Sequence, residues 1–227
     1  MKRMRELLPR TFVLTAAMAL AAGGARAEGF IDLYAGAAFH ADSDVALEVG
    51  AGFVDEVRWD NSFVPGGRGG YWLNALPWLG FALDASYFEA KQSVDPSEDR
   101  ILELTSIPIS GLVMVRYSLL VSDEFPHGQF FPYAAIGPAG FLTEMTADLR
   151  ESGFSENFKD SQADVGLDLR LGAKLHHPVK SWGFFAEYRL TYFQPSTFKD
   201  NVGGLPVAIQ PKSLLTHYMV FGFGYHF

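Results

Sequence analysis

The 227-residue chain has no cysteine, few basic residues and, after its first 27 residues, no long apolar run. The lack of cysteine excludes disulfide bonds, but it does not by itself indicate a cellular compartment. Beyond residue 27 no segment has the roughly 18 consecutive apolar residues of a transmembrane helix, which excludes membrane-spanning helices. Neither a low-complexity tract nor a linker to a second domain is visible, so we expect one domain.

The first residues have the pattern of an export signal. Lys2, Arg3, Arg5 and Arg10 precede the short apolar run TFVLTAAMALAAGGA, which closes on Ala25-Arg26-Ala27. A basic start, an apolar stretch and an A-x-A site are typical of a secretory signal peptide. A membrane anchor helix is the alternative, but the run is short for a bilayer and contains two adjacent glycines. We therefore predict a signal peptide over 1–27 and a mature domain over 28–227.

The mature chain is acidic. The whole chain has 18 basic and 26 acidic residues, of which five basic and one acidic residue lie in the predicted leader. The mature chain therefore has 13 basic and 25 acidic residues and a net charge of −12. Phosphate binding needs a basic face, so a nucleic-acid partner is excluded.

Alternation of apolar and polar residues recurs in segments separated by Gly, Pro, Asn and Asp, which predicts β-strands. Pro108, Pro132 and Pro138 weaken two of these segments as central strands. The eight predicted strands are 29–39, 68–76, 79–90, 102–119, 131–147, 161–176, 181–193 and 213–227.

Short turns follow the second and sixth predicted strands, whereas long acidic connections follow the first, third, fifth and seventh. The stretch VSDEFPHGQ after the fourth strand is the exception. Long and short connections alternate in this way in outer-membrane barrels, where the long loops are extracellular. An even strand count places both ends of the domain on the periplasmic side. The sequence thus predicts an all-β fold, an eight-stranded antiparallel up-and-down transmembrane β-barrel preceded by a signal peptide.

Each predicted strand has an apolar face and a polar face. In 161–176, one face is Ala, Val and Leu throughout, and the other carries Asp164, Asp168, Arg170 and Lys174. A soluble lipocalin-like barrel would turn the apolar face inward. Three features favour the inverse, with lipid outside: glycines on the polar face, aromatic residues near strand ends, and balanced charge.

The charges on the polar faces are equal in number. Four acids and four bases suit a closed internal network, because an unpaired buried charge is costly. We expect this network to plug the lumen, since eight strands enclose just enough room for side chains; a proton or ion path is the alternative. The predicted network is Asp32, Asp84, Arg116, Asp168, Arg170, Lys174, Glu187 and Arg189.

The segments PWLGFALDASYF, FFPYAAIGPAGF, FAEYRLTYF and the terminal FGFGYHF make the chain resemble the eight-stranded outer-membrane β-barrels of the OmpA, OmpX and opacity-protein type, a porin family. The resemblance covers the whole mature chain and implies a bacterial outer-membrane location. It also implies that Phe223, Tyr225 and Phe227 form the C-terminal signal read by the barrel assembly machinery. Unlike OmpA, the chain has no peptidoglycan-binding domain after the barrel.

Histidines are the candidates for chemistry. His217 stands ten positions before Phe227, about 23 Å higher at about 3.3 Å per residue and 45° tilt, so we expect it at the outer membrane interface. Barrel enzymes that deacylate lipid A carry a His there, which makes a catalytic base the alternative. His40, near Asp42, Ser43 and Asp44, is expected to be solvated rather than part of a triad or metal site. His176 and His177 point to opposite faces, which argues against joint metal ligation.

The predicted outer loops are rich in Asp and Glu, but no spacing resembles a calcium loop. We expect no metal, no cofactor and no catalytic residue. The expected function is structural or surface-interactive, in envelope integrity or surface interaction. The alternatives are a narrow small-solute channel and a lipid A-modifying enzyme. Expected partners are membrane lipid and lipopolysaccharide, the assembly machinery and periplasmic chaperones, and the barrel is expected to be a monomer.

Overall fold

The computed structural model describes residues 27–41, 45–48, 59–91, 101–122, 128–148, 158–177, 181–202, 205–211 and 213–227. The predicted signal peptide lies almost entirely outside these ranges. Within them, no helix is long and apolar enough to cross a membrane. The strands are β1 (Ala27–His40), β2 (Val45–Glu48), β3 (Ser62–Leu73), β4 (Leu79–Ser86), β5 (Phe88–Lys91), β6 (Ile101–Arg116), β7 (Phe130–Asp148), β8 (Phe158–His176), β9 (Trp182–Phe193), β10 (Phe198–Val202), β11 (Leu205–Pro211) and β12 (Leu214–His226).

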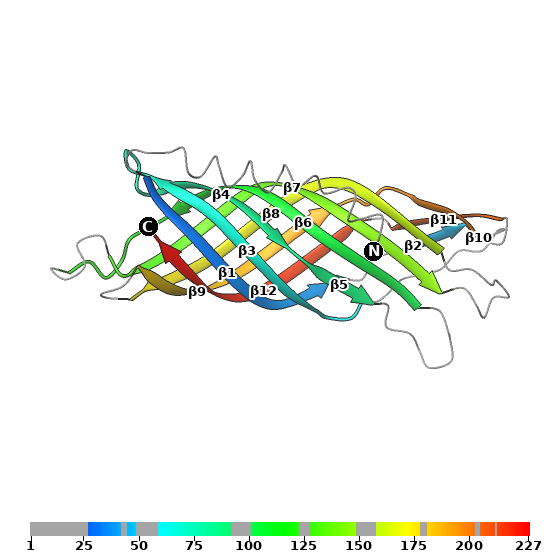
Figure 1. The fold of residues 1–227 in the computed structure, drawn as a ribbon, viewed down its shortest axis with the longest axis horizontal. Coiled ribbons are helices and arrows are strands. Elements are labelled where there is room, and N and C mark those ends of the chain that lie inside the picture. Colours follow the sequence, from blue (N-terminus) through cyan, green and yellow to red (C-terminus); the bar gives the residue numbers. More distant parts are fainter. Residues whose placement is uncertain are drawn as a thin grey trace.

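Nine of these strands close into a barrel (Figure 1) in the order β4-β3-β1-β12-β9-β8-β7-β6-β5, and β6 also pairs with β4. β4 and β5 are two parts of a single barrel strand interrupted at Tyr87, because both pair with β6. All neighbours are antiparallel, and the first strand pairs with the last. The predicted eight-stranded antiparallel barrel is therefore confirmed.

The predicted boundaries of the barrel strands agree with the structure to within three residues, except at the start of β3. This strand begins at Ser62, six residues before the predicted start at Arg68. The segment Pro65-Gly66-Gly67 has the composition of a loop. In the barrel its glycines serve packing instead, since the ring of Tyr34 lies where a side chain at position 66 would stand.

Pro108 lies inside β6, and Pro132 and Pro138 lie inside β7, so both segments form strands as predicted. The β6–β7 ladder pairs Ser110 with Ala139 and Val113 with Ile136, but it skips the two residues between them on each strand. One skipped residue is Pro138, which has no N–H to donate. Opposite it, the backbones of Gly111 and Gly137 approach so closely that a Cβ on residue 137 would collide with the Gly111 carbonyl oxygen.

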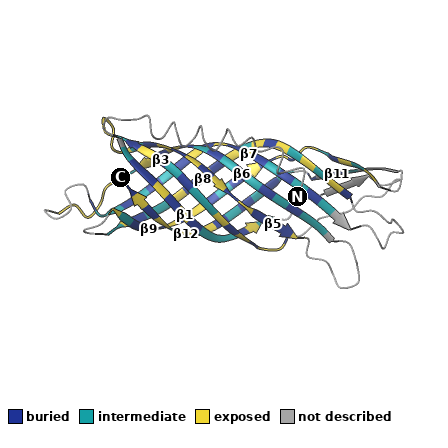
Figure 2. Ribbon diagram, viewed as in Figure 1, coloured by how far each residue is buried: buried dark blue, intermediate teal, exposed yellow. Residues whose placement is uncertain are grey.

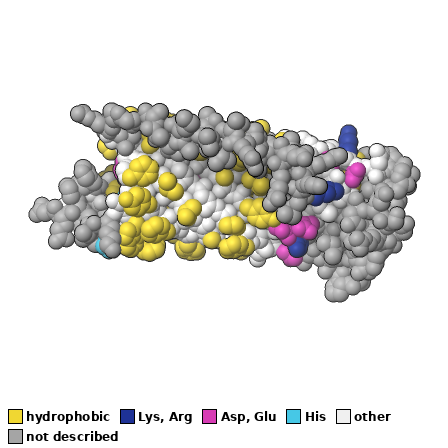
Figure 3. Space-filling model, in the orientation of Figure 1, with side chains coloured by type: hydrophobic (Ala, Val, Ile, Leu, Met, Phe, Trp, Pro, Cys, Tyr) yellow, Lys and Arg dark blue, Asp and Glu magenta, His cyan; other side chains and the backbone are white. Residues whose placement is uncertain are grey.

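Burial alternates along the barrel strands (Figure 2), and it is the apolar face that is exposed. Leu33, Val165 and Phe221 are 64%, 77% and 64% exposed, whereas Asp32, Asp168 and Arg170 are at most 1% exposed. On the face shown in Figure 3, apolar side chains spread over most of the described barrel surface and form a broad belt. The predicted inverse arrangement is confirmed, and the lipocalin-like alternative is contradicted.

The two ends of the barrel differ. The turn end holds the short connections 74–78 and 177–181 and the last residue, where Phe227 and Gly29 exchange backbone hydrogen bonds of 2.9 Å. The loop end carries a second sheet, in the order β10-β11-β2, that the sequence did not predict (Figure 1). Side chains join this sheet to the barrel: Asp160 of β8 accepts the Lys199 N–H at 2.9 Å, and Asp200 of β10 accepts the Lys159 N–H at 3.0 Å.

Candidate functional site: the filled lumen

The lumen charges stand on inward faces because β-strands repeat every two residues. Asp168, Arg170 and Lys174 share the inward face of β8, and Glu187 and Arg189 share that of β9. The glycines between them make room: a side chain at Gly224 would overlap Asp32 and Lys174. The strands thus bring the charged groups together inside the barrel.

Arg170 is the centre of the network. Its guanidinium contacts Asp84 of β4 at 2.8 Å, Asp168 at 2.7 Å and Glu187 at 3.3 Å. Arg189 lies opposite Arg170 in the β8–β9 register and pairs with Asp168 at 2.8 Å. Two adjacent cations would repel each other, so the carboxylates around them are needed for the pair to persist.

Sequence reasoning missed Arg68, which joins the two halves of the network. It donates to Glu187 of β9 at 2.6 Å and to Asp32 of β1 at 2.9 Å. Asp32 also accepts from Lys174 at 2.6 Å. The predicted strand 68–76 starts at Arg68, which puts this side chain at a strand end. The true start at Ser62 places it at mid-strand, and period-2 alternation with Trp72 would then have assigned it inward.

The structure brings seven of the eight predicted residues together, and it separates Arg116 from them. Arg116 lies near the turn end, where its guanidinium pairs with Glu28 at 2.5 Å and stacks 4.3 Å from the Trp72 ring centroid. Arg68 takes its place in the central network, so four acids still meet four bases. Each of these eight side chains is part of a residue at most 7% exposed.

Glu28 marks the periplasmic edge of β1, before the apolar belt begins. Its other oxygen accepts from His226 Nδ1 at 2.7 Å. Burial alone would raise the pKa of Glu28, but the hydrogen bonds from His226 and Arg116 outweigh burial and hold that pKa well below its usual range. The first residue of the predicted mature chain is thereby fixed to the last barrel strand as a carboxylate.

The loop-end half of the lumen is apolar, which corrects the expectation of a charged interior throughout. Its inward residues include Phe88 and Phe158, and the rings of Phe141 and Phe193 stack with centroids 4.0 Å apart. Phe198 of β10 and Ile209 of β11 close this cluster from above. Here outward positions such as Glu89, Lys91 and Lys159 are charged while the inward positions are apolar, so the polarity of the two faces is the reverse of that at mid-strand.

A small cavity of about 20 Å³ lies in the turn-end half, between the network and the mouth. Phe30, Trp72, Phe131 and Tyr133 form aromatic walls, and the polar lining is Asp32, Arg68, Arg116, Lys174, His176 and His226. This volume holds about one water molecule. The packed network and the apolar cluster fill the rest of the described lumen.

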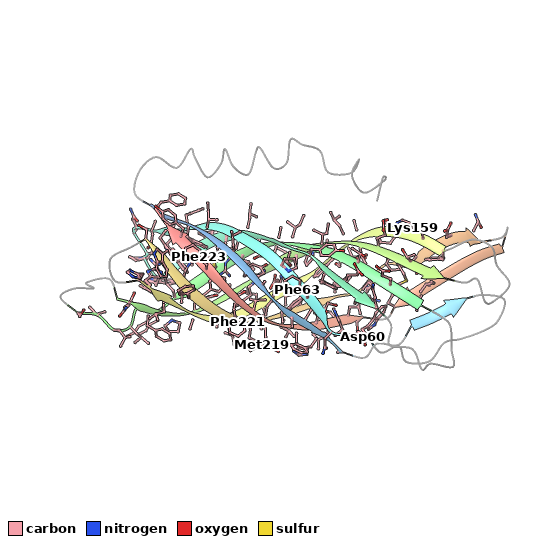
Figure 4. The ribbon with its side chains drawn as sticks, turned by 60° about the horizontal axis from the view of Figure 1, so that its bottom comes forward. Asp60, Phe63, Lys159, Met219, Phe221 and Phe223 are labelled. Carbon is pink, nitrogen blue, oxygen red and sulfur yellow. The ribbon has the colours of Figure 1, made fainter. Side chains whose placement is uncertain are left out.

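The predicted C-terminal signal residues Phe223, Tyr225 and Phe227 all point outward, 42% to 64% exposed. Figure 4 shows Phe223, Phe221 and Met219 following one another along β12 on the outer surface. The Tyr225 and Phe227 rings stack with centroids 6.4 Å apart at the turn end. This is the position that aromatic residues take at a membrane interface.

The histidine candidates are placed as follows. His217 accepts or donates one hydrogen bond with Tyr188 Oη at 2.6 Å on the outer surface. His40 points into the lumen and contacts Ser62 at 3.0 Å and Thr216 at 3.2 Å; its sequence neighbours 42–44 lie outside the described residues. His176 lies inside the barrel, and His177 packs on Trp182 at the turn.

The sequence of residues 12–227 matches the family model described as "Outer membrane protein beta-barrel domain". The chain belongs to this family. The protein accordingly lies in the bacterial outer membrane, with the turn end periplasmic and the loop end extracellular. Apart from Asp60 and Asp160, most of the acidic side chains predicted for the outer loops fall outside the described residues.

Solved structures show the same fold. The outer membrane protein OprG from Pseudomonas aeruginosa is 17% identical with a TM-score of 0.61, covering 90% of this chain and 98% of its own. The outer membrane protein AlkL, solved in lipid bilayers, is 13% identical with a TM-score of 0.50, covering 91% and 93%. No curated protein matches the chain. At these identities the likeness concerns the fold alone.

Proposed function

We propose that this outer-membrane barrel is sealed and structural: it contributes to envelope integrity and presents its loop end at the cell surface. The observation that carries this proposal is the ion network across the lumen. Arg68 and Arg170 connect β3 and β4 to β8 and β9 through three carboxylates, with distances of 2.6 to 3.3 Å. A lumen crossed by such pairs leaves no path for solutes.

Opening the lumen would require separating buried charges. Removing one partner from a buried pair costs about 3–5 kcal/mol, because the other charge is left without compensation. The aromatic cluster above the network adds a second, apolar barrier to hydrated ions. These two layers, one polar and one apolar, support a barrel that stays closed.

Planar-bilayer recording of the refolded mature protein tests the proposal. We expect no steady conductance from the wild type. Arg170→Ala and Arg189→Ala each remove a buried cation and should produce open events, whereas Lys91→Met at the loop-end rim should not. Stable pores of nanosiemens size in the wild type would contradict a sealed barrel and support the channel alternative.

The enzyme alternative is tested separately. Tyr188 is the hydrogen-bond partner that the structure shows for His217, and Ser62 and Thr216 are those of His40. We propose a non-enzymatic barrel, so incubation with lipid A should leave the mass spectrum of the lipid unchanged. A mass change that His217→Ala or His40→Ala abolishes would establish the lipid-modifying function instead.

The loop-end rim is proposed to contact lipopolysaccharide. Lys91 pairs with Glu89 at 3.0 Å and Lys159 with Glu144 at 2.7 Å. In Figure 3 charged side chains gather where the apolar belt ends, and Figure 4 places Lys159 at that end. Phosphates of the outer leaflet stand at this height. The double variant Lys91→Met, Lys159→Met should copurify with less lipopolysaccharide than the wild type. Because its apolar belt is unchanged, such a loss would be due to the two lysines.

A further inference from the structure

The periplasmic cavity contains polar groups that the sealed network does not use. The Nε2 atoms of His176 and His226 are buried without a hydrogen-bond partner, and both side chains line the cavity. His226 is only 8% exposed. A buried ring nitrogen without a partner is costly, so such an atom aimed into a cavity calls for a guest.

The surroundings of the cavity are rich in N–H donors. An ammonium group has three N–H bonds. The Lys174 ammonium group donates one of them to Asp32 Oδ1 at 2.6 Å. The guanidinium of Arg116 lines the same space between the rings of Trp72 and Phe131. These cationic donors favour an anion over a cation.

A metal ion is a poor alternative. In the part of the chain that the structure describes, no group of three or more His, Asp or Glu side chains is placed to hold one. A divalent cation would also meet Arg68, Arg116 and Lys174 at close range. Repulsion from three fixed positive charges opposes its binding.

The charge balance couples anion binding to a proton. His226 Nδ1 is bonded to Glu28, so the neutral ring presents a lone pair at Nε2. A proton taken from solvent onto Nε2 turns this atom into a donor, while the Nδ1–H bond to Glu28 is kept. One anion and one proton enter together, and the net charge of the lumen is unchanged.

We propose that this cavity binds one small monovalent inorganic anion of chloride size, together with one proton on His226. The anion contacts Lys174 Nζ, Arg116 and the protonated Nε2 atom. Its small size follows from the cavity volume of about 20 Å³, which holds about one water-sized guest. The charged and titratable groups around it are Glu28 and Asp32 of β1, Arg68 of β3, Arg116 of β6, Tyr133 of β7, Lys174 and His176 of β8, and His226 of β12.

Bromide serves as the probe. Crystals of the refolded mature barrel, grown in sodium bromide at pH 5.5 and at pH 7.5, should show an anomalous peak in the cavity that is stronger at pH 5.5. Binding linked to one proton tightens by up to about tenfold per pH unit. A cavity without a bromide peak at either pH, occupied by water alone, overturns the proposal. Equal occupancy at both pH values overturns the proton coupling.

Variants test the same site in solution by the broadening of the chloride NMR line. Lys174→Met keeps the side-chain length, leaves Asp32 paired with Arg68, and should abolish the broadening. His226→Gln cannot gain a proton and should remove its pH dependence. His40→Gln changes a lumen histidine at the opposite end and should behave as wild type. The bromide crystals decide the question if a variant does not refold, and a negative result leaves the sealed-barrel proposal untouched.

Discussion

Arg68 of β3 reaches across the lumen to Glu187 of β9, with 2.6 Å between Nη1 and Oε2, while its Nη2 holds Asp32 at 2.9 Å. Through this single side chain the turn-end pair of Lys174 and Asp32 is joined to the cluster around Arg170. The network is therefore continuous across strands that are not neighbours in the barrel wall. Its continuity, rather than the number of its charges, is what supports the proposed sealed lumen.

Arg68→Met should destabilise the barrel by about 3–5 kcal/mol, because Asp32 loses one of two cations and Glu187 keeps only Arg170, at 3.3 Å, as a cationic partner beside the Tyr133 hydroxyl at 2.8 Å. Urea-induced unfolding in lipid vesicles measures this free energy. Lys91→Met, which removes an exposed ion pair at the rim, should leave it nearly unchanged. Equal effects of the two changes would show that the network contributes no stability.

Leu169→Arg should destabilise the protein more than Leu175→Arg. Both leucines face lipid on β8, but Leu169 lies near mid-strand and Leu175 near the turn end. An Arg at the bilayer midplane costs about 2–4 kcal/mol, and one near the interface about 0–1 kcal/mol. The same vesicle unfolding assay compares them. A reversed order would mean that the apolar belt is placed wrongly along the strand.

Gly137→Ala and Gly140→Ala form a matched pair on β7. A Cβ at position 137 would collide with the Gly111 carbonyl oxygen, whereas at position 140 the nearest atom, the Ile109 carbonyl oxygen, is 4.0 Å away. Overpacking costs typically about 1–3 kcal/mol, so the first change should lower the unfolding free energy by this amount and the second should have little effect. Thermal unfolding of the two refolded variants provides the measurement.

Glu28→Gln should alter stability in acid. The pKa of Glu28 is lowered in the folded protein from its ordinary value of 4.5, since the hydrogen bonds from His226 and Arg116 outweigh burial. Its stabilisation is present above the unfolded pKa and is lost as pH falls below that value. Wild type should thus keep its advantage over Glu28→Gln from pH 7 to about pH 5 and lose it progressively as pH falls below 4.5. An unchanged difference across this range would contradict the ion pair.

Phe227→Ala should reduce the amount of assembled barrel in the outer membrane, if the terminal ring is part of the assembly signal. The backbone bonds between Phe227 and Gly29 do not need the ring, so refolding of the purified variant in detergent should proceed. Quantifying heat-modifiable barrel in membranes against refolding yield separates the two effects. Equal losses in both assays would assign the ring to folding instead.

The sequence by itself determined the fold class, most strand boundaries and the direction of most side chains, because period-2 alternation sets the face of every residue in a strand. The apolar exterior followed from it, as did the inward placement of Asp168 and Arg170. Composition gave the wrong start for β3, because Pro65-Gly66-Gly67 has the composition of a loop but forms strand. For this reason Arg68 was not predicted to belong to the network.

Only the tertiary structure decided which inward groups meet. Arg116 and Arg170 both point into the lumen, yet one pairs with Glu28 at the mouth and the other with Asp84 in the centre. Height in the barrel depends on strand tilt and register, which local alternation does not encode. The apolar loop-end core and the β10-β11-β2 sheet likewise arise from contacts between distant segments, and the cavity beside His226 is enclosed by side chains from six strands.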